Sequence, residues 1–158
     1  MKVKLLVMDI DGTLTDGKIY MGEHGEIFKA FSIKDGYGIH DILLHSSIVP
    51  VIITGRQSKI VENRCKELGI NEVYQGVKDK EKKLLQIVEK HGLSLQEVAY
   101  IGDDLNDISC MKAVKLSGGF VGCPSDAITK VKEIADYIAK TEGGNGAVRE
   151  IIDYIIDS

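Results

Sequence analysis

Short apolar segments alternate with helical segments along most of the chain. Residues 3–8, 48–53 and 98–101 are brief, strongly apolar runs, which is typical of strands buried on both faces of a sheet. Residues 58–68 and 80–91 instead repeat apolar side chains at helical spacing. Strands that alternate with helices predict an α/β fold, with a doubly wound, Rossmann-like parallel sheet covered by helices on both sides.

The weaker patterns complete this prediction. Two strand-like runs flank Gly22-Glu23-His24-Gly25, so we expect a β-hairpin inserted at about residues 18–33. A Gly-rich loop at residues 143–146 precedes a final helix that reaches about residue 156. Further strands are expected at residues 72–74, 114–116 and 137–138, and further helices at residues 38–45 and 125–134.

Composition limits the possible classes of protein. The chain has 158 residues, of which 44% are hydrophobic and 28% charged, so we expect one domain, residues 1–158. Its 20 basic and 24 acidic residues form no basic stripe, which predicts no nucleic-acid partner. No apolar run reaches the roughly 18 residues that a membrane span needs. Asp9 and Asp11 interrupt the apolar N-terminus too early for a signal peptide, so we expect a cytoplasmic location without a membrane partner.

Residues suited to phosphoryl transfer follow four of the predicted strands. Because the carboxyl ends of parallel strands meet at one edge of the sheet, we expect these side chains to converge. Clustered carboxylates favour Mg²⁺ over zinc, while a hydroxyl and an ammonium suit the oxygens of a phosphoryl group. In chain order they are Asp9 and Asp11, then Thr54, Gly55 and Arg56, then Lys80, and finally Asp103, Asp104 and Asp107.

The spacing of Asp9 and Asp11 has a chemical reason. Side chains two residues apart point the same way as the chain leaves an extended strand. One carboxylate can then attack phosphorus while the other protonates the leaving oxygen, provided that their environments hold them in different protonation states. Gly12 allows a tight turn around a bound phosphate.

These segments resemble the four motifs of the haloacid dehalogenase superfamily, in order and on the expected elements. The resemblance implies that Asp9 forms an aspartyl-phosphate, that Asp11 is the general acid and base, and that Thr54 and Lys80 bind the phosphoryl group. It implies that Mg²⁺ is held by Asp9, Asp103 and the backbone carbonyl of Asp11. Asp104 and Asp107 would lie among the metal ligands or next to them. Lys78, Lys82 and Lys83 surround Lys80, and the family's spacing from Gly76 favours Lys80.

The segments between these motifs leave no room for the cap domain that closes the site in many members of this superfamily. An open site admits water and discriminates poorly between substrates, so we expect a neighbouring subunit to cover it. The predicted hairpin offers an apolar surface that such contacts would bury. Its apolar residues are Ile19, Tyr20, Met21, Ile27, Phe28 and Phe31.

A narrower resemblance agrees with this interpretation. Residues 31–38, 53–56, 64–65 and 143–150 are similar to the capless 3-deoxy-D-manno-octulosonate (KDO) 8-phosphate phosphatases of lipopolysaccharide biosynthesis. The resemblance implies a homotetramer with a central barrel of hairpins, in which a neighbour covers each site. The candidate substrate-binding residues are Lys34, Gly55, Arg56, Arg64 and Arg149.

Several alternatives stay open. Lys34 and His40 stand where these enzymes usually carry Arg, and related phosphatases act on nine-carbon, sialic-acid-type sugar 9-phosphates. Arg56 favours the eight-carbon sugar, because the nine-carbon branch has an acidic residue there. A phosphoaccepting receiver module is a remote alternative, since no Asp follows the strand that ends at Ile53. The Gly-rich loop at residues 143–146 is either an anion site or a plain turn.

Overall fold

The computed structural model describes residues 1–158 and contains a six-stranded sheet in which all neighbouring strands are parallel. The strand order is β5-β4-β1-β6-β7-β8. In the centre, Met8 of β1 lies opposite Ile52 of β4 and Ile101 of β6, so these three strands end at the same level. The strands are β1 Leu5–Met8, β4 Val49–Ile53, β5 Glu72–Tyr74, β6 Val98–Ile101, β7 Phe120–Cys123 and β8 Tyr137–Ile138.

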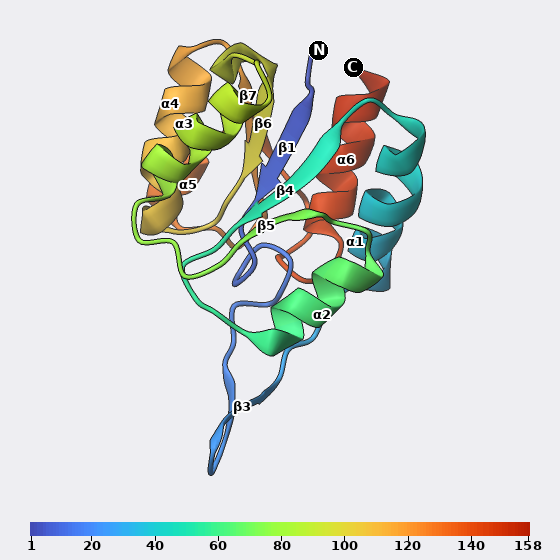
Figure 1. Ribbon diagram of the computed structural model, residues 1–158, viewed down its shortest axis with the longest axis vertical. Helices are drawn as coiled ribbons and strands as arrows, with labels where there is room; N and C mark the ends of the chain where they lie inside the picture. The colour runs from blue at the N-terminus through green and yellow to red at the C-terminus, as the bar shows by residue number, and fades with distance from the viewer.

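Helices cover both faces of this sheet, which confirms the predicted fold class (Figure 1). One face carries α3 Lys80–Lys90, α4 Ile108–Leu116 and α5 Thr129–Lys132. The other carries α1 Ile33–Tyr37, α2 Lys59–Glu67 and α6 Ala147–Asp157. Short π-helical and 3₁₀ segments are η1 Gly38–Ile42, η2 Leu43–His45, η3 Leu95–Glu97 and η4 Leu105–Asp107.

Local sequence explains where the helices begin and end. The Ser58 hydroxyl accepts a 3.2 Å hydrogen bond from the Ile60 backbone N–H and so caps the start of α2. Gly69 follows its last turn with a φ of +73°, a conformation that favours glycine. Asp79 caps α3 in the same way, accepting from the Lys82 N–H at 3.0 Å. Lys80 is therefore the first residue of α3. Its side chain lies at the edge of the sheet where the parallel strands end.

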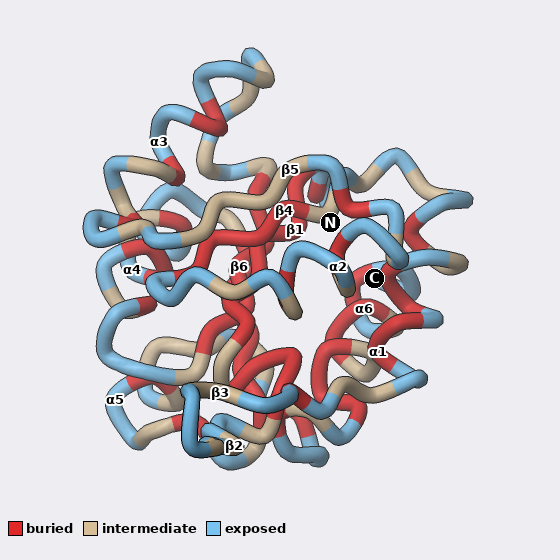
Figure 2. The backbone as a smooth tube through the Cα atoms, turned by 60° about the horizontal axis from the view of Figure 1, so that its bottom comes forward, coloured by how far each residue is buried: buried red, intermediate tan, exposed pale blue.

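The core consists of two apolar clusters, one on each face of the sheet. Figure 2 shows the central strands β1 and β6 as buried and β4 as buried over its last three residues, while much of the surrounding helical surface is exposed. All three cysteines are buried free thiols. None of the helices has the length and apolar character that crossing a membrane requires.

The β-hairpin projects from the body beyond the carboxyl ends of the strands (Figure 1). It pairs β2 Tyr20–Gly22 with β3 Gly25–Phe28 and is shorter than the predicted 18–33, because the chain turns back into the body at Lys29. Phe31 packs against the core, contrary to the prediction that placed it on the hairpin's apolar surface. Four other apolar side chains of this surface are exposed: Ile19, Met21, Ile27 and Phe28. Only this hairpin and short helices separate β1 from β4, so no cap domain is inserted there.

Some sequence predictions were wrong. Residues 114–116 belong to α4, and the strand that they were expected to form is β7, whose apolar run is interrupted by Gly122. The helix predicted at 125–134 is reduced to the short α5, and the one predicted at 38–45 begins earlier, at Ile33.

Candidate active site

The candidate site lies where the strand order reverses. The chain proceeds outward from β1 to β4 and β5, then returns to β6 on the other side, so β1 and β6 border a topological switch point. Ligand crevices in open parallel sheets lie beyond the carboxyl ends of strands at such points. Asp9 directly follows β1, Thr54 follows β4, and Asp103 comes two residues after β6.

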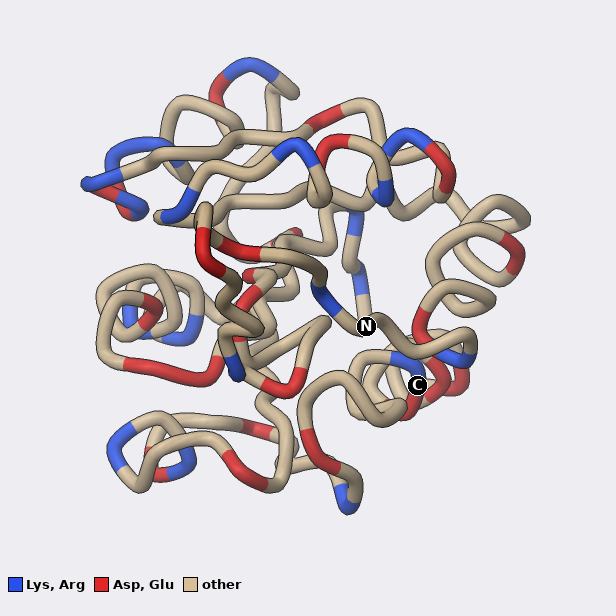
Figure 3. Tube along the Cα trace, turned by 90° about the horizontal axis from the view of Figure 1, so that it is seen from below, with Lys and Arg blue, Asp and Glu red and all other residues tan.

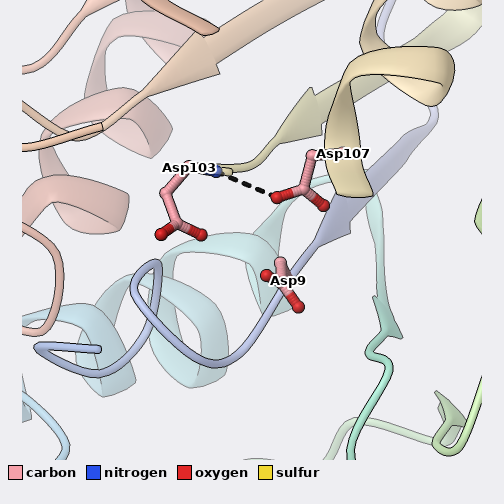
Figure 4. Close-up of side chains that lie close together, drawn as sticks. All are labelled: Asp9, Asp103 and Asp107. Carbon is pink, nitrogen blue, oxygen red and sulfur yellow. Dashed lines mark hydrogen bonds between the residues drawn. The ribbon is translucent and has the colours of Figure 1, made fainter. Parts of the chain in front are cut away.

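Three carboxylates meet at this switch point. One oxygen from each of Asp9, Asp103 and Asp107 lies within 4.8 Å of the others (Figure 4). The Thr13 hydroxyl donates to Oδ1 of Asp103 at 3.1 Å and helps to orient it. Gly12 has a φ of +87°, and a Cβ at this position would lie 1.9 Å from Oδ2 of Asp103. Glycine is therefore needed here for both backbone conformation and space.

Asp107 organises the base of this cluster. Its Oδ2 accepts hydrogen bonds from the backbone N–H groups of Asp103 and Asp104, at 3.0 and 3.3 Å. Its Oδ1 accepts from the Tyr100 hydroxyl at 2.8 Å and from the Lys80 ammonium at 2.9 Å. Asp107 thus fixes the loop after β6 and the lysine together.

Lys80 ties the cluster to the loop after β1. Its ammonium lies 3.0 Å from Oδ1 of Asp9, in addition to its contact with Asp107. All three side chains are buried, which strengthens the attraction between their charges. Of the lysines that the sequence offered here, Lys80 is the one that faces the carboxylates.

The crowding of acids has a clear electrostatic signature. Burial, reinforced by the nearby Asp107 charge, raises the pKa of Asp9 to about 7 against the opposing pull of Lys80. Burial and the charge of Asp9 raise the pKa of Asp103 to about 8. Neighbouring carboxylates that resist ionisation together are a donor set that a hard divalent cation would stabilise. The residues present therefore fit a Mg²⁺ site.

A cavity of about 170 Å³ opens at the edge of this cluster, beside Asp9. No hydrophobic side chain lines it, which suits a charged, highly polar ligand. The largest cavity, of about 630 Å³, lies near the N-terminus beside Lys2 and Phe120 and contains none of the clustered acids, so the chemistry favours the smaller one. The smaller cavity is lined by Asp9, Asp11, Thr54, Gly55, Arg56, Asp104 and Asn106.

Comparisons with known proteins agree with this geometry. The model of the haloacid dehalogenase-like hydrolase family matches residues 53–151. The 3-deoxy-D-manno-octulosonate 8-phosphate phosphatase KdsC of Escherichia coli K12 is 45% identical over 154 residues, covering 98% of this chain and 79% of the relative.

The chain belongs to the haloacid dehalogenase-like hydrolases, in the family of the KDO 8-phosphate phosphatases.

Solved structures of this hydrolase family superimpose closely on the chain. The KDO 8-phosphate phosphatase of Moraxella catarrhalis, in complex with magnesium, phosphate and KDO, is 40% identical with a TM-score of 0.91 and covers 99% of this chain and 87% of its own. The enzyme of Yersinia pestis is 41% identical with a TM-score of 0.90, covering 98% of this chain and 81% of its own. A cobalt-bound enzyme of Haemophilus influenzae is 34% identical with a TM-score of 0.91, covering 99% and 88%.

Three of the predicted substrate-binding residues of this hydrolase lie outside its own cavity. Arg64 pairs with Glu67 at 3.0 Å and stacks over Phe31. Arg149 pairs with Asp153 at 2.9 Å and lies over the Tyr37 ring. Lys34 is exposed on α1. Figure 3 looks onto the end of the molecule at which the carboxyl ends of the central strands lie and shows both acidic and basic segments there.

The Gly-rich loop of the hydrolase supports the loop after β1. A Cβ on Gly143 would lie 2.0 Å from the Gly12 carbonyl oxygen, and the Gly144 N–H donates to the Thr13 carbonyl at 3.2 Å. Next to it, the buried Asp35 carboxylate accepts from the Arg149 N–H at 2.9 Å at the start of α6. Burial raises the pKa of Asp35 to about 6. The close approach of this backbone to the loop after β1 explains why residues 143 and 144 are glycines, and no bound anion is needed to account for them.

Sequence reasoning missed four residues of this region. No sequence pattern pointed to Lys29 or Asn106, because each takes its place near the site only when separate segments of the folded chain come together. Tyr100 gave a weak signal, since a tyrosine in a wholly apolar strand needs a partner for its hydroxyl. Asp35 lies inside a segment that resembled the family, but nothing indicated that it binds the start of α6.

Proposed function

We propose that this hydrolase removes the phosphate of KDO 8-phosphate with Mg²⁺, through an aspartyl-phosphate on Asp9. One observation carries the proposal: buried acids and Lys80 converge at the switch point of a chain 45% identical to KdsC of Escherichia coli. The Moraxella catarrhalis relative, which holds magnesium, phosphate and KDO, supports both the metal and the substrate.

The first chemical step forms a bond between an Asp9 carboxylate oxygen and phosphorus. The bond from phosphorus to the sugar oxygen breaks, and that oxygen takes a proton from Asp11. In the second step water attacks the aspartyl-phosphate, Asp11 accepts the proton of the water, and inorganic phosphate leaves. Lys80 and the Thr54 hydroxyl hold the phosphoryl oxygens in both steps.

The Mg²⁺ ion would be held by the carboxylates of Asp9 and Asp103 and by the backbone carbonyl of Asp11. When bound, it neutralises negative charge on the phosphoryl oxygens and on the crowded acids. Asp104 and Asp107 act beside these ligands. Asp107 already accepts hydrogen bonds from the backbone of the loop that carries Asp103, which supports an orienting role.

Recognition of the sugar acid is proposed to begin with Arg56 and Gly55, which line the cavity. A guanidinium suits the carboxylate of such a substrate because it can donate two parallel hydrogen bonds. Lys34, Arg64 and Arg149 lie outside the cavity of their own chain, so a role for them requires that they reach the cavity of a neighbouring subunit.

A homotetramer in which a neighbour covers each site is part of the same proposal. It is supported by the projecting hairpin, on which Met21 and Ile27 are 64% and 63% exposed. So much apolar surface on an isolated two-stranded hairpin favours burial against other subunits. We further propose a cytoplasmic enzyme of lipopolysaccharide biosynthesis, in keeping with the relatives' substrate.

The test is phosphate release, with Mg²⁺, from KDO 8-phosphate beside a nine-carbon sugar-acid 9-phosphate and simple sugar phosphates. A kcat/KM advantage of about a hundredfold, or ~2.7 kcal/mol, for the eight-carbon acid is expected of a dedicated enzyme. Preference for the nine-carbon acid would keep the mechanism and change the substrate. Absence of release from every compound would contradict the proposed function.

A further inference from the structure

Lys29 is a buried lysine at the base of the hairpin, where the chain turns back toward the catalytic loop. Its side chain is only 1% exposed, although β3 has ended at the exposed Phe28 one residue earlier. A lysine is almost never buried this deeply unless its charge is paired. Its partners therefore indicate why the chain places it there.

Both partners are carboxylates. The Lys29 ammonium donates to Oδ1 of Asp11 at 2.7 Å and to Oε2 of Glu26 at 3.0 Å. The bond to Oδ1 is the one side-chain hydrogen bond that Asp11 makes within the chain. The same Glu26 oxygen lies 3.9 Å from the Arg56 guanidinium at the mouth of the cavity. A row of alternating charges thus runs from Asp11 to Arg56 through the base of the hairpin.

We propose that Lys29 is a positioning residue that aims the Asp11 carboxylate at the leaving oxygen of the substrate. This inference rests on the proposed function, in which Asp11 is the general acid and base. By holding Oδ1, Lys29 fixes the rotamer of Asp11 and leaves Oδ2 free for proton transfer. Since Glu26 belongs to β3, the same contacts make the placement of the general acid depend on the hairpin.

The consequence is specific to leaving groups that need a proton. An alkyl phosphate such as KDO 8-phosphate releases an alkoxide-like oxygen, whereas p-nitrophenyl phosphate releases a stable phenolate. Correct placement of a general acid contributes about 10²–10⁴-fold for the first kind and little for the second. Loss of a merely structural lysine would instead slow both substrates to the same extent.

The experiment compares kcat/KM for KDO 8-phosphate and p-nitrophenyl phosphate in the wild type, Lys29→Met, Lys29→Arg and Asp11→Asn. We expect Lys29→Met to lower the alkyl-to-aryl ratio by about tenfold or more, in the direction of Asp11→Asn. Lys29→Arg, which keeps the charge and the donors, should recover most of the ratio. Lys18→Met, at an exposed lysine of the same segment, is the matched control and should leave the ratio unchanged.

A double variant separates the possible outcomes. Because Lys29 acts through Asp11, the variant Asp11→Asn/Lys29→Met should have the same ratio as Asp11→Asn alone. Additive effects, or an unchanged ratio in Lys29→Met while Asp11→Asn lowers it, would overturn the inference and spare the proposed function. An unchanged ratio in Asp11→Asn would overturn both.

Poor folding of a variant does not affect this comparison. Both substrates are measured on the same preparation, so the ratio of the two kcat/KM values does not depend on the fraction of protein that is folded. Glu26→Gln, which loosens the far end of the contact, provides the same test if Lys29→Met does not fold.

Discussion

The Lys80 ammonium lies 3.0 Å from Oδ1 of Asp9, and both side chains are removed from solvent. The contact places a fixed positive charge beside the proposed nucleophile before any substrate arrives. A charge that is already in place needs no reorganisation when negative charge develops on the phosphoryl group.

Replacing the proposed nucleophile, Asp9, should lower activity without unfolding the protein. We expect Asp9→Asn to lower turnover of KDO 8-phosphate by at least about 10⁴-fold, because an amide cannot form the aspartyl-phosphate. The fold should survive, since the amide removes a buried charge and keeps the shape of the side chain. Phosphate release and circular dichroism measure the two effects, and wild-type turnover in this variant would rule out Asp9 as the nucleophile.

Replacing Lys80 should cost stability as well as activity. Lys80→Met leaves the buried carboxylates of Asp9 and Asp107 without their shared cation. Breaking a buried ion pair from one side typically costs about 3–5 kcal/mol. We therefore expect a loss of this size in the free energy of unfolding in urea, measured without metal. Lys82→Met, on the exposed side of the same helix, is the control and should change it by less than about 0.5 kcal/mol.

Binding of Mg²⁺ should release protons. In the metal-free protein, burial and the neighbouring acids raise the pKa of Asp9 to about 7 and that of Asp103 to about 8, so near neutral pH the two carboxyls are not both ionised. The metal requires ionised ligands, so its affinity should rise between about pH 6 and about pH 8. Calorimetry in buffers of different ionisation enthalpy measures the proton count. A heat that does not depend on the buffer would contradict this assignment of the acids.

Asp35 should contribute a pH dependence to stability. Burial raises its folded-state pKa to about 6, above the usual unfolded value of about 3.9. A raised pKa means that the folded state binds the proton more tightly. The contribution of Asp35 to the free energy of unfolding is therefore fully present below about pH 4, and it is lost as the pH rises through about 6.

Asp35→Asn should remove this contribution. We expect the free energy of unfolding of the wild type to fall relative to the variant by on the order of 1–3 kcal/mol between about pH 4 and about pH 7. Urea unfolding at several pH values in the presence of a chelator measures the difference. Parallel pH profiles for the two proteins would show that Asp35 does not titrate in this range.

The sequence predicted those parts of the site that topology alone brings together. Asp9, Thr54 and Asp103 follow neighbouring parallel strands, so their convergence required only the correct order of strands and helices. β7 escaped detection because Gly122 interrupts a short apolar run, while residues 114–116 continue the apolar pattern of α4. Lys29 could not be placed, because its burial depends on where the hairpin ends and on which carboxylates it then meets.

The contact between the Gly-rich loop and the loop after β1 also bears on how the enzyme is made. Gly143 and Gly144 pack on Gly12 and Thr13, which lie near the other end of the chain. Contacts between segments so far apart in the sequence are slow to form, because closing the long loop between them costs conformational entropy before the contacts are gained. During synthesis, β1 and the proposed nucleophile Asp9 leave the ribosome long before the Gly-rich loop that supports them exists. Catalytic competence is therefore gained only after nearly all of these residues have been translated and docked.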